Sequence, residues 1–148
     1  MLLQDYQRSW LELIDRFGQR EVAELESNLV HGVVANTPEQ LEALALMRLK
    51  MINQSLIDAS DLADGYIYAR LQYPNPLPSV PESLKHHVCN IARYLLAKDK
   101  AKDEIKERYK EALSWLKDVG KGAFILPFDI EEAQEIVAPV SSFRLIRN

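Results

Sequence analysis

The stretch that decides the fold reads YPNPLPSVPE and runs from residue 73 to residue 82. It holds four of the chain's seven prolines. A proline fixes φ and has no amide hydrogen, so a helix cannot propagate through such a cluster. The sequences on both sides have apolar residues at helical spacing. We therefore predict a stiff, extended reversal between two helices, held to the core by Leu77 and Val80.

A polyproline ligand for an SH3-like domain is the functional alternative for this stretch. Such ligands usually lie in disordered segments, whereas this one separates two predicted core helices. The structural interpretation is therefore favoured.

Upstream of the prolines, the sequence predicts one unusually long helix. Thr37 is a suitable N-cap, Pro38 suits the first turn, and Gln40 completes a capping box. No glycine or proline then interrupts the helix before Gly65. Thirty-odd residues at about 1.5 Å each give a rod of roughly 50 Å, which either spans the domain or projects from it. Its predicted apolar stripe is Ala45, Leu49, Ile52, Leu56, Ala59, Ala63 and Ile67, widened by Leu44, Met47 and Met51.

Three further helices are predicted, one before the long helix and two after the prolines. The N-terminal helix ends at Gly18, and the loop SNLVHGVVANTP (27–38) follows a short second turn. The third helix has Pro81 in its first turn, and the charged run AKDKAKDE separates it from the fourth, which Gly120 and Gly122 end. The apolar faces are Trp10, Leu13, Ile14 and Phe17; Leu84, Val88, Ile91, Ala92, Leu95 and Leu96; and Ile105, Tyr109, Ala112, Leu113, Leu116 and Val119.

These elements predict an all-α fold, a small helical bundle with one long helix, a proline-rich reversal and an extended C-terminal arm. The helical domain is assigned to residues 1–122 and the arm to residues 123–148. Within the bundle, Leu56, Ile91, Leu95 and Leu113 are expected to be largely buried. We also predict that Arg93, beside the apolar face of its helix, pairs with Asp61 or Asp64 on the helix before the reversal.

Composition narrows the function classes. The chain of 148 residues carries a net charge of −4 with a pI near 5.4, which argues against broad nucleic-acid binding. Between Lys98 and Lys121, eight basic residues mix with six acidic ones, as on a solvated helix surface. The single cysteine cannot form an internal disulfide, so a reducing compartment is expected. No apolar run approaches membrane-span length, and MLLQDYQRSW is unlike a secretory signal.

The sequence gives only weak evidence for catalytic or metal-binding residues. Asp58, Asp61 and Asp64 lie three apart and could bind a divalent ion or share a proton, but helical charge rows are usually solvated. His86 and Cys89 are half of a zinc site whose other half is missing. No phosphate-binding loop or nucleophile motif is present. We predict no catalytic, metal-binding or cofactor-binding residue and no enzyme activity.

A family resemblance adds to these patterns. The stretches LIDRFGQREVAEL, DASDLADGYIYARLQYPNPLPSVPESLKHHVCNIARYLL and IKERYKEALSWLKDVGKG resemble a family of Mu-like phage and prophage proteins. The resemblance covers roughly residues 10 to 126, more loosely from Asn28 to Leu49 and least in the C-terminal tail. Asn90 departs from the pattern, which has an aspartate there. The most specific positions are Gly65, Tyr66, Arg70, Tyr73, Leu77, Pro78, Pro81, Ile91, Ala92, Arg93, Tyr94, Arg108, Tyr109, Ala112, Leu113, Trp115 and Leu116.

The resembled family is similar to the small all-helical head–tail connector proteins of tailed phages. The resemblance implies a structural subunit that forms a homo-oligomeric ring on assembly, although such subunits can be monomers in isolation. It implies phage portal and neck or tail proteins as partners, DNA only as it passes through the channel, and no membrane or cofactor. The implied location is the virion, or the host cytoplasm during assembly. The alternative is a small helical adaptor or regulatory protein of phage or bacterial origin.

The C-terminal arm is the predicted interaction element. Phe124, Ile125, Leu126 and Phe128 form an apolar patch, and Pro127 prevents a regular helix through it. Soluble proteins rarely expose such a patch without a partner. The arm either folds back on its own helices or docks on a neighbouring subunit or neck protein, with Gly120 and Gly122 as the hinge.

Overall fold

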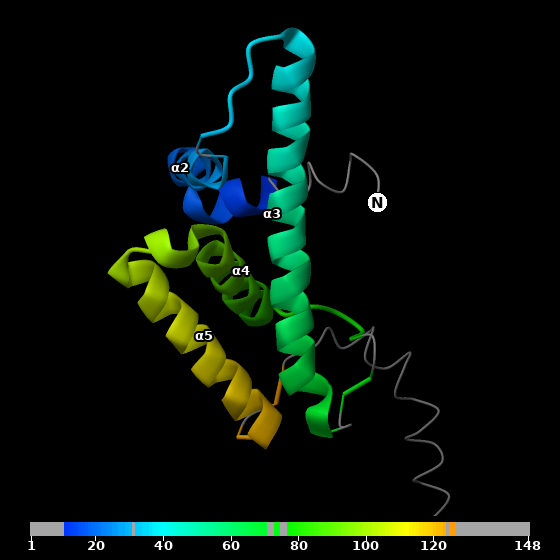
Figure 1. The fold of residues 1–148 in the computed structure, drawn as a ribbon. Helices are drawn as coiled ribbons and strands as arrows, with labels where there is room; N and C mark the ends of the chain where they lie inside the picture. Colours follow the sequence, from blue (N-terminus) through cyan, green and yellow to red (C-terminus); the bar gives the residue numbers. More distant parts are fainter. Residues whose placement is uncertain (1–10, 31, 71–72, 75–76, 124, 127–148) are drawn as a thin grey trace, which may run out of the picture.

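The structure is a computed structural model, and it describes residues 11–30, 32–70, 73–74, 77–123 and 125–126. Every regular element in this part of the chain is helical, which confirms the predicted all-α class (Figure 1). Residues 11–17 form a helical segment that is followed by α2 (Gln19–Leu29), α3 (Pro38–Ile67), η1 (Tyr68–Arg70), α4 (Glu82–Ala97), η2 (Lys98–Lys100) and α5 (Asp103–Lys121).

The long helix α3 begins with the predicted capping box. The Thr37 hydroxyl accepts a hydrogen bond from the Gln40 amide at 3.1 Å, and the Gln40 side chain accepts one from the Thr37 amide at 3.2 Å. Thirty residues make a rod of about 45 Å. Figure 1 shows this rod running the height of the molecule, with α2, α4 and α5 on one side of it.

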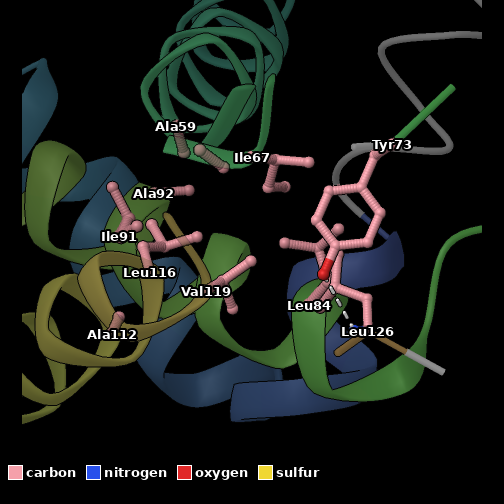
Figure 2. Close-up of a cluster of buried hydrophobic side chains, with 11 residues drawn as sticks. Ala59, Ile67, Tyr73, Leu84, Ile91, Ala92, Ala112, Leu116, Val119 and Leu126 are labelled. Atoms are coloured by element: carbon pink, nitrogen blue, oxygen red, sulfur yellow. Dashed lines mark hydrogen bonds between the residues drawn. The ribbon is translucent and has the colours of Figure 1, made fainter. Parts of the chain in front are cut away.

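The second half of α3 packs against α4 and α5 in the main hydrophobic cluster (Figure 2). Ala59 and Ala63 present small side chains to this contact, so the helices can approach closely. Tyr94 of α4 and Tyr109 of α5 stack with ring centroids 4.0 Å apart. The predicted three-helix bundle is therefore confirmed. Of the four residues expected to be largely buried, Ile91 is fully buried, whereas Leu56, Leu95 and Leu113 are only partly buried.

A second hydrophobic cluster holds the N-terminal helices against the bundle. Leu13, Val22 and Leu25 are buried against residues of α3, α4 and α5. The chain turns between residues 11–17 and α2 at Gly18, whose φ of 89° favours glycine. The predicted helix end at Gly18 is confirmed.

The first half of α3 extends beyond this core. Figure 1 shows that it rises past α4 and α5, beside the loop that leads from α2. Ala45, predicted as a core residue, is exposed, and the buried positions of α3 begin only at Ile52. The bundle helices α4 and α5 have 16 and 19 residues, against 30 in α3, and are too short to cover the whole stripe.

The proline-rich link is fixed differently from the prediction. Leu77 packs against the main cluster as expected, but Val80 is 50% exposed, so it does not hold the link. Tyr73 takes that role, since it is buried and its hydroxyl accepts a hydrogen bond from the Leu126 amide at 3.2 Å (Figure 2).

The end of α5 also differs from the prediction. Gly120 lies inside the helix, and a Cβ there would approach the Tyr66 carbonyl oxygen to 3.1 Å, so this glycine allows α3 and α5 to pass closely. The helix ends at Gly122, whose φ of 77° gives a left-handed cap. The chain then continues to Leu126, which is 2% exposed in the main cluster. The start of the predicted arm thus packs against the helical domain, and the domain boundary after residue 122 stays a prediction.

Candidate interaction surfaces

Arg93 forms the best-defined polar site of the core, but not with the predicted partners. Its guanidinium binds both carboxylate oxygens of Glu21 on α2, including a 3.0 Å bond from Nε, and lies 3.5 Å from Glu104 of α5. Its side chain is 7% exposed, and the ring of Phe17 lies 4.8 Å from Cζ. Burial lowers the pKa of Arg93, but the hydrogen bonds and negative charges of Glu21 and Glu104 outweigh it and raise the pKa above its ordinary value.

The prediction that Arg93 pairs with Asp61 or Asp64 is therefore wrong. On α3, Ala59 and Ala63 face the bundle, and successive residues turn by about 100°. Asp61, two positions from each alanine, points away from α4, and Asp64 is also exposed. Arg93 turns instead toward α2 and α5, so it ties three helices together.

The predicted arm residues divide between core and surface. Leu126 is buried, so it is not available to a partner, whereas Ile125 is 79% exposed. Phe124 and Phe128 lie outside the described residues. For the described part, the arm begins by folding back on its own helices. Docking of the rest on a neighbour stays a prediction.

Large exposed apolar side chains lie on the first half of α3, and of these only Met47 belongs to the predicted stripe. Leu41 is 54% exposed, and Leu46 and Met47 are more than one-third exposed. The adjoining loop adds Val33 and Val34 at 52% and 74% exposed. We call these five residues the α3 surface. One feature of the sequence indicates that this part of α3 is exposed. The apolar stripe of α3 is longer than the shorter bundle helices can cover.

His87 and Cys89 occupy structural positions. The ring of His87 packs on Trp115 with centroids 4.6 Å apart, and burial, with the charge of His86, lowers its pKa. Cys89 is 3% exposed, and burial raises the pKa of its thiol to about 11, so the thiol stays protonated at neutral pH. This confirms Cys89 as a core residue. Among the described residues, no group of three or more His, Cys, Asp or Glu side chains is placed to hold a metal ion.

No helix in the described part of the chain combines the length and apolar character that a membrane crossing requires. In the part of the chain that the structure describes, the helical bundle presents the α3 surface as its main exposed apolar feature.

Comparison with known proteins gives two curated relatives. The chain is 39% identical over 85 residues to the Mu-like prophage FluMu protein gp36 of Haemophilus influenzae, which covers 57% of this chain and 58% of that protein. It is 36% identical over 69 residues to Gene product J of Escherichia phage Mu, which covers 47% of this chain and 48% of that protein. The chain thus matches less than two thirds of the length of these relatives. No solved structure matches it.

A family model gives the broader match. The model described as Bacteriophage Mu, Gp36 matches residues 10–141, a span that contains α2 to α5, the proline-rich link and Leu126. The matched region therefore includes both hydrophobic clusters, the Arg93 site and the α3 surface. The chain belongs to the Bacteriophage Mu Gp36 family and is thus a phage or prophage protein.

Proposed function

We propose that the protein is a subunit of a phage head–tail connector, which acts by associating with further copies of itself and with portal and neck or tail proteins. Membership of the Gp36 family supports a phage structural or assembly role. The similarity of its sequence motifs to small all-helical connector proteins supports the finer assignment. The setting would be the virion, and the host cytoplasm during assembly.

The observation that carries this proposal is the α3 surface. Leu41 and Met47 project from a helix whose other half is buried in the bundle, and Val33 and Val34 lie on the loop before it. An exposed apolar patch on a protein surface marks an interaction site, and we propose that these five side chains contribute to one. A rod of about 45 Å can also contact a neighbour along its length without disturbing the bundle.

The net charge of −4 is compatible with a connector channel. DNA that passes through a channel must not bind its wall tightly, and phosphate binding requires a basic surface. On α5, basic residues alternate with acids, as in the pair of Arg108 and Glu111 at 2.9 Å. This mixed surface suits passage better than binding.

Electron microscopy of the protein mixed with its own portal tests the proposal. We expect ring-shaped particles at the portal, and we expect Leu41→Glu with Met47→Glu to abolish them. Lys50→Gln, on an exposed position of the same helix, is the matched control and should leave the rings intact. A complex with one or two copies per portal would overturn the connector assignment in favour of the adaptor alternative.

A further inference from the structure

A pocket opens between the second half of α3, the proline-rich link and the start of α4. Its volume is about 470 Å³, which lies within the range of ligand-binding pockets. Its polar and charged lining residues are Glu12, Ser60, Asp64, Tyr68 and Lys85. The apolar residues of its lining include Ala63, Ile67, Leu77, Leu84, Val88 and Cys89.

The edge of the pocket carries negative charge that the described residues leave unbalanced. Glu12 is bound by Arg16 at 2.9 Å, and Lys85 lies 3.5 Å from Glu82. Within the described chain, no lysine or arginine lies within salt-bridge distance of Asp61 or Asp64. Partial burial and the charge of Asp61 raise the pKa of Asp64. A cation beside these two carboxylates would relieve their repulsion.

The pocket therefore favours an occupant with apolar side chains and positive charge. The side chains of residues 1–10 include one acid and one base, so they carry no net side-chain charge. Residues 127–142 carry four acids and no lysine or arginine. Residues 143–148, FRLIRN, carry three large apolar side chains, two arginines and no acid. Of these three segments, only the last has both properties.

We propose that the pocket binds the chain's own residues 143–148, with Phe143, Leu145 and Ile146 supplying the apolar contacts and Arg144 or Arg147 pairing with Asp64, the carboxylate that lines the pocket. Leu126 lies near the pocket, because Ile67 and Leu84 line the pocket and also belong to the hydrophobic cluster that contains Leu126. The proposal does not depend on the connector assignment.

Residues 143–148 belong to the same chain as the pocket, which favours them over the same residues of a second copy. Sixteen residues, 127–142, lie between Leu126 and Phe143. A flexible segment of that length spans about 20–25 Å on average and keeps its end at roughly millimolar effective concentration. A separate copy would have to reach that concentration in solution to compete.

Disulfide trapping in the full-length protein tests the proposal. In a Cys89→Ala background, Val80→Cys at the half-exposed pocket edge is combined with Leu145→Cys. The matched control combines Leu145→Cys with Lys110→Cys, an exposed position on α5 that does not line the pocket. Under mild oxidation, we expect the pocket pair to form an intrachain disulfide about tenfold faster than the control pair. Mass spectrometry and non-reducing gels distinguish intrachain from interchain bonds.

Charge variants supply a second measurement. Asp61→Asn with Asp64→Asn should slow the intrachain disulfide several-fold, whereas Asp58→Asn, which removes the next carboxylate of the same row, should not. Arg144→Ala with Arg147→Ala introduces no cysteine, so it keeps the test valid if the cysteine variants fail to fold. It should increase hydrogen exchange at the first amides of α4. Equal rates for both cysteine pairs, purely interchain disulfides, or unchanged exchange would each overturn the proposal.

Discussion

Arg93 of α4 and Glu21 of α2, 72 residues apart in the sequence, form a two-pronged ion pair at the junction of three helices. The guanidinium is almost fully buried, whereas Glu21 is 26% exposed and Glu104, the second acid, is 67% exposed. Removing Glu21 would thus leave a buried charge with one weak partner. Such a loss costs far more than the intact pair contributes.

We expect Glu21→Gln to lower the free energy of unfolding by about 1–3 kcal/mol, because a buried charged donor loses its main acceptor. Urea denaturation measures the change. Glu24→Gln is the matched control on the same helix, since its partner Lys102 is exposed and 3.4 Å away. It should change stability by less than about 0.5 kcal/mol. Equal effects of the two variants would show that the pair of Arg93 and Glu21 contributes no more to stability than an exposed ion pair.

We predict that alanine has opposite effects on stability at the two helical glycines, Gly65 and Gly120. Alanine normally stabilises a helix interior by about 0.5–1 kcal/mol over glycine, and a Cβ at Gly65 meets nothing within 4 Å. Gly65→Ala should therefore raise the melting temperature. At Gly120 a Cβ would press on the Tyr66 carbonyl, a backbone atom that cannot rotate away. Gly120→Ala should therefore lower stability by about 1–3 kcal/mol. Stabilisation by both variants would contradict the close helix contact.

The helices and the main core could be predicted from sequence because their signals are local. The capping box at Thr37, the stop at Gly18 and the apolar stripes each depend on residues within a few turns. The Arg93 partner could not be predicted in this way. The predicted partners, Asp61 and Asp64, lie on the helix adjacent in sequence. The observed partner, Glu21, reaches Arg93 only because α2 packs across α4.

The exposed half of α3 shows a second limit of sequence patterns. Periodicity marks which face of a helix is apolar, but it does not say where along the helix a partner ends. Ala45 and Ile52 fall on the same predicted stripe, yet one is exposed and the other buried. The roles of Gly120 and Tyr73 likewise depend on atoms from distant segments, Tyr66 and Leu126.

The exposed position of the α3 N-terminus predicts a local effect for its cap. Thr37→Ala removes the hydroxyl that accepts from Gln40, which usually costs about 1 kcal/mol of helix stability. Because the first turns of α3 lie outside the core, they can fray without global unfolding. We expect faster hydrogen exchange at the first turns of α3 with little change in melting temperature. Thr37→Ser should restore the wild-type exchange. A large fall in melting temperature would contradict local fraying.

His87 predicts acid sensitivity. Burial lowers its pKa, so the unfolded chain binds a proton more readily than the folded chain. Stability from this group is complete above the unfolded pKa of about 6.5 and is lost as pH falls through that value toward the lower folded pKa. We expect His87→Gln to reduce the loss of melting temperature between pH 7 and pH 5 relative to wild type. His86→Gln, at the exposed neighbour whose charge also lowers the pKa of His87, should reduce this loss by less. An unchanged slope in His87→Gln would contradict this role.

The contact between Tyr73 and Leu126 predicts where the folded domain ends. Tyr73→Phe would leave the buried Leu126 amide without its acceptor, at a cost of about 1–2 kcal/mol. Leu126→Ala would remove a fully buried side chain, at about 2–4 kcal/mol. Ile125→Ala, at the exposed neighbour, should change stability by less than about 0.5 kcal/mol.

Truncation tests the same contact without changing the core itself. A chain that ends at residue 126 keeps both the Leu126 side chain and its hydrogen bond to Tyr73, so we expect it to melt close to the full-length protein. A chain that ends at residue 122 loses both and should melt at least several degrees lower, because about 2–4 kcal/mol is a large part of a small domain's stability. Circular dichroism measures both melting curves. If the two truncated chains melt at the same temperature, Leu126 does not belong to the folded domain, and the folded domain ends at residue 122 as predicted from the sequence.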